Sequence, residues 1–316
     1  MLAKTYDIIN CGPRSRFAAN GAIVSNCNWQ NLPKRGLGGE LRKSLVAPDG
    51  HVLIISDASQ IEPRLLAWAS GQQDVLDVFA NGGDVYCATA SDIYGRIITP
   101  DDKDERFTGK VYVIGGGYGA GAPKLNYMMK IGKFGPPVHQ DLEVTKSDLA
   151  TWRTARPFIT REWKNNNDNA KIAFLNLTDI DDGVVVYEGT KRGGYMHMPN
   201  GSYIFYPNVQ MDDDGRDYYY VARNGPVKLY GGILTENKIQ ALARVMIGSQ
   251  FLRMQEEMPD MRIATSSHDE GVFVVPIKKA ERYAENVQRI MSTTTDWARG
   301  LPLNAETHIS KIYDKS

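Results

Sequence analysis

Neither a long apolar run nor a signal-peptide pattern occurs in the 316-residue sequence. Because a membrane-spanning helix needs about 20 predominantly apolar residues, the sequence predicts no membrane partner and a cytoplasmic location. The three cysteines, Cys11, Cys27 and Cys87, are an odd number and lack the spacing of metal ligands. They therefore argue against a disulfide framework and against a zinc site.

The sequence also lacks an excess of charge of either sign, because 37 Lys and Arg residues balance 37 Asp and Glu residues. Bulk charge thus gives no sign of a nucleic-acid partner, and such an interpretation depends on local basic patches such as Lys34, Arg35, Arg42 and Lys43. The apolar content of 42% is ordinary for a globular protein, and the length suffices for roughly two domains.

Short apolar strands and helical runs occur together in the chain. His51–Ile55 is a continuous apolar run, typical of a buried central strand, and a helix is expected from Glu62 to Gly71. Residues 80–198 are mostly helical in pattern. From Tyr203 onward an alternating pattern rich in Tyr and Val favours strands.

Four further segments have recognisable patterns. Thr235–Met254 combines helix-starting residues with apolar residues at helical spacing, and Val272–Val275 predicts a second buried strand, which places Asp269 beside a tight turn. The acidic run Asp212–Gly215 lacks the following Glu of a calcium loop, so we expect a solvated turn. Phe17–Asn26 contains an Asn-Gly turn signal followed by a short apolar strand.

Two carboxylates stand at strand ends, Asp57 after the first buried strand and Asp269 before the second. Either Asp taken alone more often caps a helix or a turn. If the two strands lie side by side, however, the carboxylates lie a few ångströms apart and repel one another unless divalent metal ions compensate. Two magnesium ions about 3.5–4 Å apart serve phosphoryl transfer, so we predict that Asp57 and Asp269 are metal ligands.

Between the two acids, Arg106, Lys110, Ile114 and Tyr118 follow one another at intervals of four residues, which places them along one helix face. Two cations one turn apart suit successive phosphates of a nucleotide, and the apolar pair suits a base. The glycines at positions 115–117 predict close backbone approach or a hinge. The spacing fits neither a Gly-x-Gly-x-x-Gly nor a Walker motif, and an ordinary solvated helix is the remaining alternative.

These residues closely resemble the motifs of the DNA polymerase I type, family A, particularly its phage members. Ser56–Arg64 is similar to motif A, Arg106–Gly119 to motif B and His268–Glu270 to motif C, and further family segments match Gln30–Pro33 and Leu229–Gln240. The resemblance covers about residues 27–316. It implies an α+β fold, with a polymerase palm formed by an antiparallel sheet with helices, together with a mainly helical fingers subdomain.

The resemblance also implies a division into palm residues 27–79, fingers residues 80–198 and further palm residues 199–316. It implies two Mg²⁺ ions held by Asp57 and Asp269 with support from Glu270, and the partners primer-template DNA and deoxynucleoside triphosphates. The residues that it places at the nucleotide are Gln60, Glu62, Tyr86, Arg106, Lys110, Ile114 and Tyr118. The residues that it places at the DNA are Arg64, Gly119, Gln240 and His268.

The resemblance implies that Glu62 selects the sugar of the incoming nucleotide. Glu62 is expected to fill the space that a ribose 2′-hydroxyl needs, which favours a deoxynucleotide. Single-subunit RNA polymerases share much of the layout but lack an acid there, so the resemblance favours DNA. Ile114 stands where many members have Phe or Tyr, and Tyr86 where many have His, which affects the details of sugar and base selection.

The first 26 residues resemble a different family. Thr5–Ile9 and Phe17–Asn26, followed by Cys27, are similar to the C-terminal end of an intein and the residue after it. An Asn side chain can cleave the backbone at its own carbonyl, and a Cys thiolate can first accept the upstream chain as a thioester. The resemblance therefore implies a split-intein fragment over residues 1–26, with Asn26 and Cys27 as splicing residues. The implied partner is an N-terminal polymerase half that carries the thumb and the N-terminal intein piece.

Three functions are open on these grounds. The chain is expected to be a DNA polymerase fragment that trans-splicing completes, and intact Asp57, Lys110 and Asp269 favour this function over an inactive remnant that only binds DNA. An autoprocessing and association module is the third possibility. An ordinary hairpin leading into the palm is the alternative to an intein fragment at residues 1–26.

Overall fold

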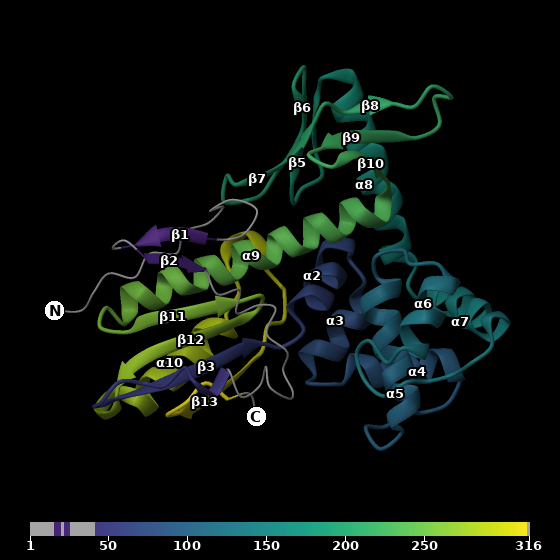
Figure 1. The fold of residues 1–316 in the computed structure, drawn as a ribbon. Coiled ribbons are helices and arrows are strands. Elements are labelled where there is room, and N and C mark those ends of the chain that lie inside the picture. The colour runs from purple at the N-terminus through teal and green to yellow at the C-terminus, as the bar shows by residue number, and fades with distance from the viewer. Residues whose placement is uncertain (1–15, 20–21, 26–41, 315–316) are drawn as a thin grey trace.

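The computed structural model describes residues 16–19, 22–25 and 42–314 of the chain. An antiparallel sheet lies at one end of the molecule and a group of helices at the other (Figure 1). The long helix α9 (Gly231–Glu257) extends from the sheet to the helical end, and β5 to β10 lie beside the half of α9 that is farther from the main sheet (Figure 1). The mixture of antiparallel sheets and helices confirms the predicted α+β class.

The main sheet joins strands from both ends of the chain. It consists of β11 (Arg262–Ser267), β12 (Glu270–Pro276), β3 (His51–Ala58) and β13 (Ala305–Ser310), which are hydrogen-bonded in that order. All neighbours are antiparallel. The strands predicted from the two apolar runs are both present, and each extends beyond its predicted bounds. Because β3 is central, its side chains are covered on both faces of the sheet.

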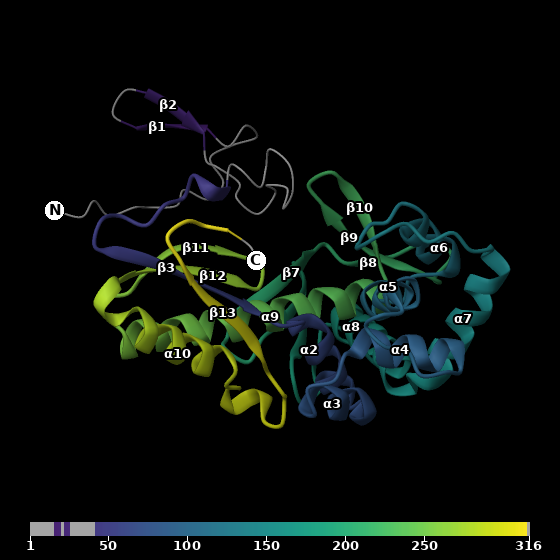
Figure 2. The same cartoon turned by 90° about the horizontal axis from the view of Figure 1, so that it is seen from below.

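The two faces of this sheet differ. Ile54 and Phe273 belong to the large core shared with α9 and α10 (Ala280–Met291), and the rings of Phe273 and Phe251 pack edge to face with centroids 5.3 Å apart. Figure 2 shows α10 along this side of the sheet. The opposite face carries the smaller cluster that includes Leu53 and Val272. Since side chains alternate along a strand, this second face is also the one to which Asp57 belongs.

Helices fill the chain between β3 and residue 176. They are α2 (Ile61–Ser70), α3 (Gln73–Ala80), α4 (Val85–Tyr94), α5 (Lys103–Val111), α6 (Ala122–Lys130), α7 (Leu142–Ala155) and α8 (Pro157–Asn176). The predicted helix from Glu62 is α2, and it ends at Gly71, whose φ of 74° suits glycine. Trp152 of α7 and Trp163 of α8 stack with ring centroids 6.2 Å apart.

The prediction that residues 80–198 are mostly helical is wrong for its last part. That part forms β4 (Asp179–Asp181), β5 (Val186–Thr190) and β6 (Gly193–His197), which continue in one sheet with β7 (Tyr203–Pro207). β-Branched, aromatic and glycine residues dominate this stretch, and they fit a pleated sheet better than a helix. The predicted domain boundary between residues 198 and 199 falls inside this sheet, between β6 and β7.

The strands predicted after Tyr203 are present. They are β7 together with the smaller sheet of β8 (Gln210–Met211), β9 (Tyr218–Ala222) and β10 (Gly225–Leu229). Asp212–Gly215 forms the predicted turn between β8 and β9, in which the Asp212 carboxylate accepts the amides of Arg216 and Asp217. Near the N-terminus β1 (Arg16–Ala19) pairs with β2 (Ala22–Ser25).

Helix α9 is longer than its predicted range Thr235–Met254 and has buried residues on several sides. It packs against α8, α2 and α10. A helix that is apolar on several sides belongs in a core rather than at a surface. Short 3₁₀ turns at Ile277–Lys279 and Asp296–Ala298 flank α10.

Two glycines offer a matched test of this packing. A Cβ at Gly189 of β5 would stand 1.9 Å from the carbonyl oxygen of Ala173 in α8, whereas a Cβ at Gly248 of α9 meets nothing within 4 Å. We expect Gly189→Ala to lower the free energy of unfolding by about 3 kcal/mol through overpacking. Gly248→Ala should raise it by about 0.5–1 kcal/mol because alanine favours the helix. Urea unfolding measures both, and equal effects of the two substitutions would contradict the packing of β5 on α8.

Candidate functional site

The two predicted acidic strand ends lie side by side. The register pairs Asp57 of β3 with Glu270 of β12, and the amide of Ala58 donates to the carbonyl oxygen of Asp269 at 2.9 Å. Cα atoms of directly opposed residues in antiparallel strands are about 4.5–5.5 Å apart. The structure therefore joins, through backbone contacts, two acids that are 212 positions apart in the sequence. Both are half-buried.

A tight turn presents the second acid. His268 and Asp269 connect β11 to β12, and His268 has a φ of 54°, in the left-handed region that non-glycine residues rarely adopt. Such a conformation costs about 1–2 kcal/mol and occurs often at functional sites. The side chain of His268 is exposed.

Glu270 is held from within the protein. It is 3% exposed, accepts a hydrogen bond from the Tyr313 hydroxyl, and lies 4.0 Å from the Arg42 guanidinium. Arg42 also donates to the Tyr313 hydroxyl at 2.6 Å. Arg42 itself is buried, so the structure replaces the surface basic patch predicted there with an internal contact that anchors the start of β12. Lys34 and Arg35 lie outside the described residues.

The first predicted cation, Arg106 of α5, is positioned by Asp84. One carboxylate oxygen of Asp84 caps α4 through the amides of Tyr86 and Cys87, and the other accepts the Arg106 Nε–H at 2.7 Å. Burial acts to raise the pKa of Asp84, but the hydrogen bonds from Arg106 and the two amides outweigh it, so this pKa lies below its ordinary value.

The two predicted cations converge on one ring. The Arg106 guanidinium lies 5.4 Å and the Lys110 ammonium 5.7 Å from the centroid of Tyr86, and Lys110 also donates to the carbonyl oxygen of Phe134. Burial, and after it the charge of Asp84, raises the pKa of Tyr86 to about 12, with a further contribution from Asp269. The Asp269 carboxylate therefore lies within electrostatic range of the ring that the two cations share.

The predicted single helix face from Arg106 to Tyr118 is interrupted. α5 ends at Val111, and residues Tyr112–Gly116 form a turn of π-helix before the chain leaves the helix. Because a π turn has a different period, Ile114 and Tyr118 do not continue the row of Arg106 and Lys110. The three glycines that begin at Gly115 allow this change of period. Ile114 is half-buried within the π turn.

Tyr118 and Glu62 meet at the junction of the π turn and α2. The Tyr118 hydroxyl donates to the Glu62 carboxylate at 2.7 Å. Burial, followed by the negative charge of Glu62, raises the pKa of Tyr118 well above its ordinary value. The sequence predicted both residues at the nucleotide, and the hydrogen bond connects them. Gln60 precedes α2 with a left-handed φ of 54° and is half-buried.

Arg64, which the sequence predicted at the DNA, makes contacts within the protein. Its side chain is buried, donates to the carbonyl oxygens of Ser59 and Pro302, and stacks on Phe79 with the guanidinium carbon 4.2 Å from the ring centroid. Burial lowers its pKa to about 10. The structure thus gives Arg64 an internal role, which connects α2 to the segment before β13.

The other residues predicted at DNA have accessible positions. Gln240 is exposed on α9, where it contacts Glu236. Gly119, at a φ of 76°, lies in an open groove with a volume of about 680 Å³ between the end of the π segment, α8 and the start of α9. The other residues that line the groove include Arg153, Trp163, Lys164 and Tyr230.

Several residues that shape the site were not predicted. Asp84, Arg42 and Tyr313 hold predicted residues in place, and Glu306 of β13 lies opposite Asp57. Asp84 carries a recognisable signal, since it follows two glycines and precedes a helix. Arg42 and Tyr313 have no comparable signal, because their contacts span 271 residues.

Three of the sequence predictions receive no structural description of their own. Asn26, Cys27 and the segment Gln30–Pro33 lie outside the described residues. Within residues 42–314, no group of three or more His, Cys, Asp and Glu side chains is arranged as a metal site. In the same part of the chain, no helix has both the length and the apolar content of a membrane span.

Comparison with known proteins identifies a family match in the first part of the chain and homologues along most of it. Residues 4–136 match the family model described as DNA polymerase family A, a match that begins inside the segment predicted to be an intein fragment. The DNA polymerase of Bacillus phage SP02 is 28% identical over 289 residues, which are 87% of this chain and 43% of that protein. DNA polymerase I of Pseudomonas aeruginosa is 36% identical over 95% of this chain and 29% of its own length.

The fold gives the same result. The POL domain of Pol1 from M. smegmatis, solved in complex with DNA primer-template and dNTP, superposes with a TM-score of 0.68 at 20% identity. The match covers 94% of this chain and 46% of that one. Sheet and helices therefore have the arrangement of a polymerase domain. The chain therefore contains a region of DNA polymerase family A, is homologous to phage DNA polymerase and bacterial DNA polymerase I, and spans less than half the length of these relatives.

The ion pair of Asp84 predicts a pH-dependent contribution to stability. Because the folded-state pKa is depressed, the contribution is fully present above the ordinary pKa of 3.8 and is lost as the pH falls through the folded-state value. Asp84→Asn keeps a capping oxygen but removes the charge, so we expect a loss of about 0.5–1 kcal/mol at neutral pH. This difference from the unmodified protein should begin to shrink as the pH falls below about 3.8 and vanish once the pH lies below the depressed folded-state pKa.

Urea unfolding at several pH values measures this difference. Asp213→Asn, in the exposed turn after β8, is the control and should show no such trend. A difference for Asp84→Asn that stays constant down to the lowest pH would contradict the ion pair with Arg106.

Proposed function

We propose that the chain supplies the palm and fingers of a DNA-directed DNA polymerase that transfers deoxynucleotides to a primer. One observation carries this proposal: the register of β3 and β12 brings Asp57 beside Asp269, within electrostatic range of the ring shared by Arg106 and Lys110. Acids on one side and cations on the other are what nucleotidyl transfer requires of a protein. In this proposal residues 27–79 and 199–316 form the palm and residues 80–198 the fingers.

The half-buried carboxylates of Asp57 and Asp269 suit magnesium, which takes one or two protein carboxylates and completes its shell with water and substrate phosphates. When bound, two magnesium ions activate an attacking oxygen and stabilise a leaving one. Glu270 would support Asp57 and Asp269 from its buried position, because Arg42 and Tyr313 hold it in place.

The cationic side of the site would bind the triphosphate. Arg106 offers a fork of donors and Lys110 a point charge, and together they would neutralise charge on successive phosphates. Tyr86 lies against both cations and limits the positions that they adopt. Because Arg106 donates a hydrogen bond to Asp84, a triphosphate would compete with Asp84 for this arginine.

Selection of the sugar would come from Glu62. Its hydrogen bond from Tyr118 restrains the carboxylate, and a restrained side chain excludes an additional hydroxyl better than a mobile one. Gln60 and Ile114 would complete the nucleotide pocket. Gln240, His268 and Gly119 are accessible for contacts with primer-template DNA.

We also propose that residues 1–26 are a split-intein fragment, which joins the chain to an N-terminal polymerase half by trans-splicing between Asn26 and Cys27. The sequence Ser-Asn-Cys at positions 25–27 supports this proposal. An alternative is that these residues belong to the polymerase itself, which the family match from residue 4 favours. An association module and an inactive DNA-binding remnant are the competing functions. For the polymerase and the splicing activity we propose a cytoplasmic location.

Removal of either acid tests the polymerase proposal. Asp57→Ala or Asp269→Ala, in the polymerase assembled from this chain, should reduce primer extension more than about 100-fold because magnesium loses a ligand. Glu285→Gln is the control, since this exposed residue lies on α10 against the other face of the sheet. Residual activity above a hundredth of normal, in variants with unchanged melting temperature, would rule out the proposed metal roles.

Splicing is tested by coexpression with a polymerase half that carries an N-terminal intein piece. The expected product begins its C-terminal portion at Cys27, and Asn26→Ala should block release of the intein segment. Asn31→Ala, beyond the junction, is the control. Mass spectrometry that finds the chain intact at position 26 in every case would favour residues 1–26 as part of the polymerase.

A further inference from the structure

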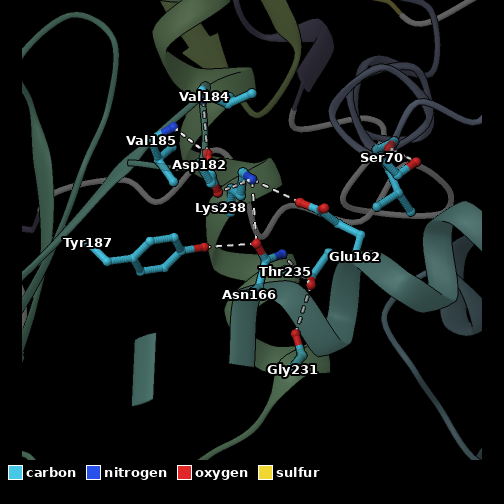
Figure 3. A network of polar contacts seen from close by, with 12 residues as sticks. Ser70, Glu162, Asn166, Asp182, Val184, Val185, Tyr187, Gly231, Thr235 and Lys238 are labelled. Carbon is cyan, nitrogen blue, oxygen red and sulfur yellow. Dashed lines mark hydrogen bonds and ion pairs between the residues drawn. The ribbon is translucent and has the colours of Figure 1, made fainter. Parts of the chain in front are cut away.

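A buried lysine connects three elements away from the acidic site. Lys238 of α9 is 1% exposed, and its ammonium lies 2.8 Å from a carboxylate oxygen of Glu162 in α8. A carboxylate oxygen of Asp182, in the turn between β4 and β5, lies 2.7 Å from the same ammonium. Figure 3 shows the two acids approaching Lys238 from different elements. One charge thus holds α8, α9 and the β4–β5 turn together.

Neutral hydrogen bonds extend this contact along the interface of α8 and α9. Asn166 of α8 donates to the Thr235 hydroxyl at 2.8 Å, and its amide oxygen accepts the Tyr187 hydroxyl at 2.8 Å (Figure 3). Thr235 in turn donates to the carbonyl oxygen of Gly231, in the first turn of α9. The network therefore reaches from Lys238 to the start of α9.

The start of α9 and the neighbouring turn of α8 enclose the segment after the π turn. Trp163, which follows Glu162, donates from its indole nitrogen to the carbonyl oxygen of Gly117 at 2.8 Å. A Cβ at Gly231 would stand 2.1 Å from the Trp163 carbonyl oxygen, and one at Gly232 would stand 2.3 Å from that of Tyr118. Backbones this close leave Gly117–Gly119 no room to shift unless α8 and α9 move apart.

We propose that Lys238 is a positioning residue, which locks α8 to α9 and thereby sets the position of Tyr118 and its hydrogen bond to Glu62. This inference rests on the proposed polymerase function only for its effect on nucleotide selection. Lys238 touches no reacting group, and its action passes through Trp163 and the start of α9.

The ionic character of the lock follows from its geometry. An apolar residue at position 238 fills space but leaves α8 and α9 free to slide, whereas an ammonium between two fixed carboxylates has one favourable position. Asp182 is itself fixed, because its other carboxylate oxygen accepts the amides of Val184 and Val185 at 2.9 Å. A buried ion pair of this kind specifies an arrangement more than it adds stability, which is the role proposed here.

The test compares two variants of the full chain. Lys238→Met alone leaves two buried carboxylates without their cation, and we expect its melting temperature to fall by roughly 5–10 °C. The triple variant Lys238→Met, Glu162→Gln, Asp182→Asn removes all three charges with little change of volume and should recover most of that loss. Lys228→Met is the control, because this exposed lysine of β10 forms its ion pair with Asp217 at the surface.

Hydrogen exchange of the amides of Tyr118, Gly119 and Ala120, which bond to carbonyls of Gly115 and Gly116, measures positioning without reference to activity. In the triple variant we expect exchange at least about fivefold faster than in the unmodified protein. In the assembled polymerase the KM for a deoxynucleoside triphosphate should rise about tenfold with a smaller change in kcat, and discrimination against ribonucleotides should weaken.

The outcomes separate the two proposals. A triple variant with normal stability, normal exchange and normal KM would overturn the positioning role and leave Lys238 as a structural residue alone. Faster exchange in a protein that never extends a primer would support the lock but refute the polymerase function. The control variant should resemble the unmodified protein in every measurement.

Discussion

The pairing of β12 with β3 is the constraint on which the rest of the site depends. The segments that carry Asp57 and Asp269 are far apart in the sequence, and no local interaction brings them together. Backbone hydrogen bonds over the whole length of β12, from Glu270 opposite Asp57 to Pro276 opposite His51, fix their relation. A slip of one residue would move every side chain of β12 to the other face, so the buried Phe273 and Val275 also secure the placement of the acids.

Close backbone packing serves the opposite side of the site. A Cβ at Gly117, just after the π turn, or at Gly231 or Gly232 at the start of α9 would stand 2.6, 2.1 or 2.3 Å from a neighbouring carbonyl oxygen, which is closer than a side chain allows. Gly109 of α5 shows the same relation, because a Cβ there would stand 2.1 Å from the carbonyl oxygen of Tyr86. This contact brings α4 and α5 close enough for Tyr86 to lie beneath both Arg106 and Lys110. Glycines thus determine the geometry of the cationic side, as strand register determines that of the acidic side.

Sequence patterns predicted the buried strands, the helix after Asp57 and most of α9, because each has a strong period or a continuous apolar run. The motifs named Asp57, Asp269, Arg106 and Lys110 as site residues, and their roles remain predictions. The patterns failed where the strand signal was weak. β4 to β6 follow a long helical stretch, and their glycines and short length obscure the strand period. The π turn was missed because spacing of four residues describes an α-helix, and nothing in the residues alone reveals a local change of period.

Contacts between residues that are far apart in the sequence could not be predicted either. The internal contacts of Arg42 and Arg64 were not predicted, since an arginine in sequence carries no sign of burial. Both lie inside the protein, where Arg42 meets Tyr313 and Arg64 meets two backbone carbonyls. Arg64 donates from both Nε and Nη1, which the planar fork of a guanidinium allows.

Asp84 connects two events that are otherwise separate. The Asp84 carboxylate caps the start of α4 with one oxygen and accepts a hydrogen bond from Arg106 with the other. An anion that draws Arg106 away would therefore remove one of the contacts that hold the capping carboxylate in place. Thermodynamic reciprocity then requires that whatever stabilises the start of α4 also alters the affinity of Arg106 for that anion. In the proposed polymerase, affinity for the triphosphate would thereby be linked to the stability of the helix end that Asp84 caps.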